Sequence, residues 1–280
     1  MSPIRRLAFV VNTGKSGAAD LARELIAIAR TVGVRRIKSR PARKLPRGYF
    51  DGCDAGCIIG GDGTLLGAVS EAAAAGVPLI GVNQGSLGYL TSFSPDEARA
   101  CFGDVLLGHY RIAQRTLLEC RTATHRRDLA LNDVLIKAEV NSQLVRLEVR
   151  ADGQLVTDYL CDGLVLSTPT GSTAYNLSAG GPILHPEAGV IAMTPICPHT
   201  LSNRTIVFND GVKLSIRNCT PGSRLLVAVD GQHNRIVING SSVEVTIAKR
   251  RLGLVQRRDY RHFSVMRAKL KWSGGLTDKK

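Results

Sequence analysis

The chain has 280 residues, of which 44% are hydrophobic and 21% are charged. This composition is that of an ordinary globular protein, long enough for one large or two medium domains, and it excludes disordered and fibrous chains. No stretch approaches the roughly 18 consecutive apolar residues of a membrane helix, and the N-terminus lacks the apolar segment and cleavage site of a signal peptide. We therefore expect a cytoplasmic protein with no membrane partner.

The net charge of +14 is concentrated at the two ends of the chain. Residues 1–50 carry twelve Lys and Arg against two acidic residues, and residues 249–280 carry eleven against two, which leaves −5 for the 198 residues between them. Such a surplus attracts either nucleic acid or a phosphate-bearing small molecule. Because the sequence has no recognised nucleic-acid module and no aromatic residues interleaved with the basic ones, we do not expect a nucleic-acid partner.

The seven cysteines are scattered, odd in number and without a Cys-x-x-Cys pair. This pattern favours neither a disulfide framework nor a zinc site, and we expect reduced thiols. We predict no metal ligands, since no His, Cys and acidic residues stand at ligand spacing around His199.

The first hundred residues alternate apolar runs with helical periodicity, which predicts a Rossmann-like open α/β sheet. A capping box, Ser94 to Glu97 with Pro95 at the first helical position, predicts the start of the last helix of this region. In chain order we expect a strand at 7–11, a helix at 18–32, an exposed basic connection at 35–47, a strand at 57–59, a helix at 65–75, a strand at 77–82 and a helix from 95 towards 107.

From about residue 110 the pattern changes to period-two alternation, which is typical of β-structure. Two strands at 144–149 and 155–157 flank Asp152-Gly153, a hairpin signal. Further strands are expected at 205–208, 213–217, 225–229, 235–238 and 243–248. The sequence thus predicts a two-domain α+β protein, with an α/β domain at 1–108, an all-β, sandwich-like domain at 109–250 and a tail at 251–280.

Gly60-Gly61-Asp62-Gly63-Thr64 follows a predicted strand and precedes a helix. Glycine-rich turns in this position hold phosphate groups with backbone N–H donors, and a carboxylate among them has a separate task, such as binding Mg²⁺ or accepting a proton. The alternative is a tight turn capped by Asp62. The dinucleotide fingerprint Gly-x-Gly-x-x-Gly is absent, because Leu66 stands where its last glycine would be. The P-loop is absent too: Gly14-Lys15-Ser16 would need a glycine five residues before Gly14, and Phe9 stands there. We favour a surface turn at 12–17, and leave contact between Lys15 and phosphate open.

The second polar region extends from Asp162 to Ile183 and contains hydroxyl residues, glycine turns and Tyr175. It suits a polar ligand with ring systems, although a loop between sheets is the alternative. Taken singly, the polar segments at 132–133, 195–199 and 230–232 are turns more often than sites.

Together these segments resemble the NAD kinase family, in the family's order and approximate spacing. The resemblance covers residues 57–270 and includes the tail residues Phe263, Arg267, Lys269, Leu270 and the following Trp272. Its motifs are Gly60–Thr64, Asn132-Asp133, Asp162-Gly163, Ser167–Tyr175, Gly180–Ile183, Pro195–Ser202 and Asp230–Gln232. The glycine turn also occurs in lipid kinases and phosphofructokinases, whereas the segment from Thr168 to Tyr175 is specific to this family.

The resemblance implies transfer of the γ-phosphoryl group of ATP, with Mg²⁺ or another divalent metal, to the 2′-hydroxyl of the adenosine ribose of NAD. It implies Asp62 as the general base and Gly63 as backbone donor to phosphate. The residues it implies for NAD binding are Asn132, Asp133, Asp162, Thr173, Ala174, Tyr175, Asn176, Leu177, Ser178 and Gln232. It further implies a tail that returns to the N-terminal domain, NAD at the domain junction, and a homodimer or homotetramer.

Two departures from the family are evident. Asp133 stands where the family usually has Glu, and Leu160 stands where some members have an Arg that bears on the choice between NAD and NADH. That choice, and the choice between ATP and polyphosphate, stay open. The alternatives are a lipid or other small-molecule kinase with the same turn, and a non-catalytic protein that binds nucleotides or nucleic acid.

Overall fold

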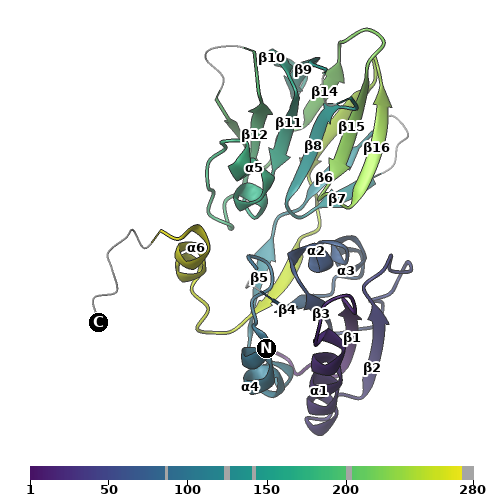
Figure 1. The fold of residues 1–280 in the computed structure, drawn as a ribbon, viewed down its shortest axis with the longest axis vertical. Coiled ribbons are helices and arrows are strands. Elements are labelled where there is room, and N and C mark those ends of the chain that lie inside the picture. Colours follow the sequence, from purple (N-terminus) through teal and green to yellow (C-terminus); the bar gives the residue numbers. More distant parts are fainter. Residues whose placement is uncertain (86–87, 123–126, 141–142, 200–203, 273–280) are drawn as a thin grey trace. The chain divides into compact units, whose positions relative to one another are not determined.

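The computed structural model describes residues 1–85, 88–122, 127–140, 143–199 and 204–272. The chain forms two compact units (Figure 1). Unit 1 comprises Met1–Ala113 together with Gly253–Lys280, and unit 2 comprises Gln114–Leu252. The chain therefore leaves unit 1, forms unit 2, and then returns to complete the sheet of unit 1.

Unit 1 is a six-stranded sheet with the strand order β2-β1-β3-β4-β18-β5. Strands β1 to β4 and β18 are parallel, and β1, β3 and β4 are almost entirely buried, as expected for central strands covered on both faces. The described part of the chain has no helix long and apolar enough to span a membrane. The elements are β1 Arg6–Val11, α1 Ala18–Thr31, β2 Arg36–Pro41, β3 Ala55–Gly60, α2 Asp62–Leu66, α3 Val69–Ala75, β4 Leu79–Asn83, α4 Pro95–Leu106, β5 Arg111–Arg115, β18 Leu252–Gln256 and α6 His262–Leu270.

Two predictions for unit 1 are wrong in detail. The basic segment 35–47, expected to be a connection, contains the edge strand β2, whose side chains are mostly exposed on both faces and so show no alternation. The single helix expected at 65–75 is two helices, α2 and α3, with Gly67 and Ala68 between them. The capping box is confirmed, since the Glu97 N–H donates to Ser94 Oγ at 3.2 Å and the Ser94 N–H donates to Glu97 Oε2 at 2.9 Å.

Unit 2 consists of two six-stranded sheets, β10-β9-β14-β17-β6-β7 and β13-β12-β11-β8-β15-β16. The strand pairs are antiparallel, and buried side chains from both sheets form one hydrophobic core, which confirms the all-β sandwich. The elements are β6 Leu118–Arg121, β7 Arg127–Ala130, β8 Asp133–Ala138, β9 Val145–Ala151, β10 Gln154–Cys161, β11 Gly163–Ser167, the 3-10 turn Gly171–Thr173, α5 Tyr175–Ser178, β12 Val190–Ile196, β13 Ile206–Asn209, β14 Leu214–Asn218, β15 Arg224–Val229, β16 His233–Ile238 and β17 Ser242–Ile247.

Two hairpin turns of unit 2 place an aspartate in the left-handed region. At the predicted hairpin between β9 and β10, Asp152 and Gly153 have φ angles of 49° and 83°. Asp230 and Gly231, between β15 and β16, have φ angles of 50° and 63°. Asp-Gly is the favoured pair for such a turn, because Gly tolerates positive φ and Asp tolerates it better than most residues.

All seven cysteines are free thiols. Cys57, Cys120 and Cys161 are buried, and burial raises the pKa of Cys120 and of Cys161 to about 12. The thiols of these three are therefore protonated at neutral pH, and they behave as core residues.

Candidate functional site

The carboxyl ends of three parallel strands gather the polar loops of unit 1. The loop after β1 (Asn12–Gly17), the glycine turn after β3 and the residues after β4 all leave the same edge of the sheet. Ligands of open α/β sheets bind outside this edge. The predicted phosphate turn is therefore in the position that such folds use for binding.

Asp62 is the first residue of α2 and is half-buried. Its Oδ1 accepts hydrogen bonds from the N–H groups of Leu90 and Thr91 and from Thr91 Oγ1, at 3.2, 3.1 and 3.0 Å. Among the described residues, its Oδ2 accepts a single bond, from the Tyr89 N–H at 2.8 Å. Because a carboxylate oxygen can accept about two hydrogen bonds, Oδ2 retains the capacity to accept a proton.

Gly88 leaves room for this arrangement. A Cβ on Gly88 would lie 1.9 Å from Asp62 Oδ1 and 2.4 Å from Thr91 Oγ1, so any other residue would displace the carboxylate. The sequence predicted no role for residues 88–91, which lie more than twenty residues after Asp62. The one local feature that points to this segment is Gly88, a glycine shortly after a strand.

In unit 2, Asp230 organises the start of β8. Its carboxylate accepts from the N–H groups of Leu131, Asn132 and Asp133 at 2.7, 2.7 and 3.1 Å. The Asp230 N–H donates in return to the carbonyl oxygen of Asp133 at 3.0 Å. These contacts place Asn132 and Asp133 beside the turn that contains Gln232, which is exposed. The sequence pointed to Gln232 in this turn, but it gave no sign that Asp230 anchors the start of β8.

The Asp133 and Asp230 side chains are both buried, each with 8% of its surface exposed. Burial raises the pKa of Asp230 to about 6, against the opposing effect of its three backbone donors. Burial raises the pKa of Asp133 to about 7, and the negative charge of Asp230 raises it further. No described residue donates a hydrogen bond to the Asp133 carboxyl group. At neutral pH this group is therefore poised between its acid and carboxylate forms.

The hydroxyl-rich segment starts beside Asp133. Ser167 pairs with Asp133 in the ladder between β11 and β8, and the Thr168 N–H donates to the carbonyl oxygen of Asn132 at 2.9 Å. Gly171 packs on Asn132, since a Cβ there would lie 2.0 Å from the Asn132 oxygen. The structure thus brings Asn132, Asp133 and the segment from Thr168 to Ser178 together at one end of this sheet.

The predicted residues 173–178 differ in exposure. Tyr175 is 43% exposed, Ser178 is exposed, and Thr173, Ala174 and Leu177 are half-buried. Asn176 is fully buried: its Nδ2 donates to the carbonyl oxygens of Ser172 and Pro182 at 3.2 and 3.0 Å, and its Oδ1 accepts from Thr194 Oγ1 at 2.7 Å. The Asn176 side chain therefore positions the segment, and its neighbours are the ones accessible to a ligand.

The structure separates Asp162 from this group. Asp162 precedes β11, whose first residue Gly163 pairs with Lys137, while its last residue Ser167 pairs with Asp133. Five residues of strand at about 3.3 Å per residue put Asp162 roughly 17 Å from the Asn132 end. Of the motif at 195–202, residues 200–202 lie outside the described residues.

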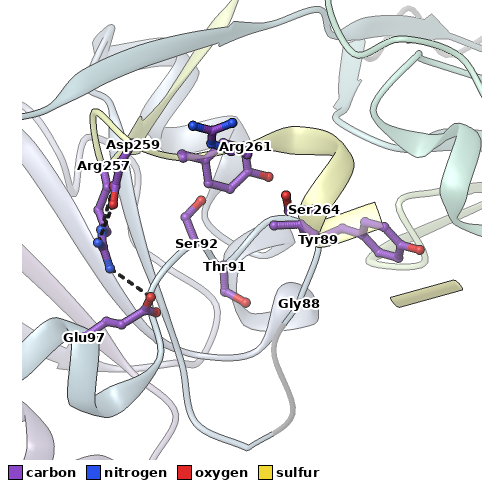
Figure 2. A pocket seen from close by; sticks show the side chains of 11 residues that line it. Gly88, Tyr89, Thr91, Ser92, Glu97, Arg257, Asp259, Arg261 and Ser264 are labelled. Atoms are coloured by element: carbon purple, nitrogen blue, oxygen red, sulfur yellow. Dashed lines mark hydrogen bonds and ion pairs between the residues drawn. The ribbon is translucent and has the colours of Figure 1, made fainter. Parts of the chain in front are cut away.

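A cavity of about 280 Å³ lies in unit 1, between the loop that binds Asp62 and the C-terminal segment (Figure 2). Tyr89 and Thr91 line it, together with Arg257, which bonds Glu97 Oε1 at 3.0 Å and Asp259 Oδ2 at 2.6 Å. The residues after β18 are thus tied to the start of α4. Among the described residues, no group of three or more His, Cys, Asp and Glu side chains could hold a metal ion.

Both sequence and structure comparisons match one family. The model of the ATP-NAD kinase N-terminal domain matches residues 35–110, and that of the ATP-NAD kinase C-terminal domain matches residues 131–257. An NAD kinase of Pseudomonas savastanoi pv. phaseolicola is 39% identical over 231 residues, covering 80% of this chain and 77% of that protein. An NAD kinase of Pseudomonas entomophila is 38% identical over 230 residues, with the same coverage.

Two solved structures share the fold. Yeast NADH kinase complexed with NADH superimposes with a TM-score of 0.81 at 21% identity, covering 100% of this chain and 91% of that one. An NAD kinase from Archaeoglobus fulgidus in complex with ATP gives 0.77 at 21% identity, covering 95% and 98%. The two domain models, the identity to the Pseudomonas enzymes and the glycine turn with its anchored aspartate lead to one conclusion: this chain belongs to the NAD kinase family of phosphotransferases.

Proposed function

We propose that this protein transfers the γ-phosphoryl group of ATP to the 2′-hydroxyl of the adenosine ribose of NAD, giving NADP and ADP. The observation that carries the proposal is Asp62, which is held at the glycine turn by four hydrogen bonds while its Oδ2 accepts only one of them. An anchored carboxylate with a free lone pair is what a general base requires.

In the proposed reaction, Asp62 Oδ2 takes the proton of the 2′-hydroxyl. The 2′-oxygen forms a bond to the γ-phosphorus, the bond from that phosphorus to the β–γ bridging oxygen breaks, and its electron pair leaves with ADP. Because such transfers depend on positioning and charge neutralisation, a glycine turn with a fixed base suffices on the protein side. The divalent metal enters as part of the MgATP substrate, and Gly63 presents its backbone to phosphate.

We assign NAD binding to unit 2. The polar groups of Asn132, Asp133 and Gln232 hold the nucleotide, and Thr173, Ala174, Tyr175, Leu177 and Ser178 line its site, with Asn176 holding that segment in place. Asp162 remains a proposed NAD ligand, although it lies at the other end of β11 from Asn132. We further propose a cytoplasmic homodimer or homotetramer.

The test is production of NADP by the purified protein. NAD and MgATP are supplied, and the NADP formed is measured with an NADP-specific dehydrogenase. NADH replaces NAD in a second arm, since the yeast neighbour is an NADH kinase. Polyphosphate replaces ATP in a third, and labelled ATP with diacylglycerol tests the lipid-kinase alternative. Absence of NADP and NADPH in every arm would contradict the proposal, and salt-dependent retention of RNA or DNA by an inactive protein would favour the non-catalytic alternative.

A further inference from the structure

Lys15 lies in the loop after β1, within the Gly14-Lys15-Ser16 sequence that fails the P-loop spacing. Its Nζ donates to the carbonyl oxygen of Gln84 at 2.7 Å. Gln84 in turn donates through its N–H to Gly60 O at 2.5 Å and through Nε2 to Ser16 O at 2.7 Å. The loops after β1 and β4 and the last residue of β3 are therefore bonded to one another, and the Lys15 ammonium is held among them.

This position is directly against the glycine turn. A Cβ on Gly61 would lie 3.0 Å from Lys15 Nζ, and a Cβ on Gly85 would lie 3.7 Å from it. The absence of side chains at both positions lets the ammonium approach bare backbone. Gly61 immediately precedes Asp62, so the fixed positive charge and the proposed base stand at the same turn.

The Lys15 charge is available to a ligand. An ammonium has three donors, and the bond to Gln84 uses one of them. Lys15 forms no ion pair with any acidic side chain of the described residues. Strand β2 is parallel to β1, so Arg43 and Lys44, which follow β2, leave the sheet at the same edge as the loop that contains Lys15. A phosphate is the group that such an environment favours.

We propose that Lys15 binds the terminal phosphate of the phosphoryl donor and neutralises its charge during transfer. The proposal rests on the proposed function. The phosphate that must stand beside the base is the one that is transferred, which selects the donor over the pyrophosphate of NAD as the partner of Lys15. Positively charged groups that are held against the transferring phosphoryl group stabilise its charge in the transition state, which is a general source of catalysis in phosphoryl transfer.

The test compares initial rates of Lys15→Met, Lys15→Arg and Lys15→Gln with the parent protein, varying MgATP and NAD separately. For Lys15→Met we expect kcat/KM for ATP to fall about 10- to 100-fold, the usual effect of losing a charge-assisted hydrogen bond, with KM for NAD within about twofold. Lys15→Arg restores part of the loss, because it keeps the charge. Lys15→Gln keeps a donor for Gln84 O without the charge, so it stays folded and remains impaired.

Lys249→Met is the matched control, since Lys249 is an exposed cation in a turn of unit 2. It removes the same charge and should leave both Michaelis constants unchanged. Full activity of Lys15→Gln would overturn the proposal by showing a purely structural role, as would a rise in KM for NAD in place of that for ATP. An inactive parent protein would instead contradict the proposed function. If Lys15→Met does not fold, Lys15→Gln and Lys15→Arg decide the question.

Discussion

Asp133 and Asp230 hold each other in place: the Asp133 N–H donates to the Asp230 carboxylate at 3.1 Å, and the Asp230 N–H donates to the Asp133 carbonyl oxygen at 3.0 Å. The contact brings two buried acidic side chains close together, and both have raised pKa values. The proposed NAD-binding end of unit 2 thus has a charge state that changes near neutral pH.

The pH dependence of stability follows from the raised pKa of Asp133, about 7 against 3.8 for the unfolded chain. The folded state binds the proton more tightly, so this group stabilises the protein at low pH, and the stability is lost as the pH rises from about 4 to about 7. Asp133→Asn removes the titration. The unfolding free energy of Asp133→Asn minus that of the parent protein should therefore increase as the pH rises through this range, by on the order of 2–4 kcal/mol. Urea unfolding at pH 5 and pH 8 measures it, and an equal difference at both pH values would contradict the raised pKa.

The variant Asp62→Asn tests the proposal that Asp62 is the general base. The amide keeps an oxygen for Leu90 and Thr91 but cannot accept the substrate proton, so kcat should fall by roughly 10²- to 10⁴-fold. NAD binding, measured by calorimetry, should change little. Thr91→Val is the comparison, since it removes one hydrogen bond to Asp62 Oδ1 and leaves the base intact. If both variants lose activity equally, Asp62 serves as a loop anchor only.

Gly88→Ala should abolish activity in a folded protein. The added Cβ would lie 1.9 Å from Asp62 Oδ1, so the carboxylate has to leave its position. Gly103→Ala, in α4, is the matched control, because a Cβ there would lie at ordinary contact distances of 3.5 Å from Val32 and 3.7 Å from Ile28. NADP formation and circular dichroism of the two variants check the prediction, and it fails if Gly88→Ala retains parent activity.

Asn176→Ala should destabilise unit 2 by about 2–4 kcal/mol, because the carbonyl oxygen of Ser172 and the hydroxyl of Thr194, both in buried residues, lose a partner. Ser178→Ala, at an exposed position three residues before Gly181, should leave stability within about 0.5 kcal/mol of the parent. Thermal unfolding of both variants gives the comparison. Equal stability of the two would show that Asn176 has no positioning role.

The charge of the chain belongs mainly to unit 1, which carries 22 Lys and Arg against 11 Asp and Glu. This surplus should concentrate a polyanionic donor, and salt screens it. The Michaelis constant for ATP should therefore rise more steeply with ionic strength than that for NAD. Initial rates between 20 and 300 mM KCl, roughly one decade of ionic strength, test this. If the two Michaelis constants depend equally on ionic strength, the positive charge of unit 1 is solvated surface and does not attract ATP.

Features that depend on neighbouring residues could be predicted from the sequence. The capping box at Ser94 and the Asp152-Gly153 hairpin are confirmed because a cap or turn is decided within about four residues. The glycine-rich segment, too, joins a strand to a helix as its residues indicate, with Gly60 at the end of β3 and Asp62 at the start of α2. Strand β2 was missed, since an edge strand exposed on both faces has no hydrophobic alternation to read.

The sequence by itself determined the two kinds of domain, the family motifs and the aspartate at the turn. Only the tertiary structure decided what those side chains contact. Asp62 bonds a loop 27 to 29 residues away, Asp230 bonds the segment at the start of β8, 97 to 99 residues away, and Lys15 bonds Gln84 across 69 residues. It likewise separated Asp162 from Asn132. The physical reason is that strand order and register bring distant segments together, and neither is encoded in the local pattern of residues.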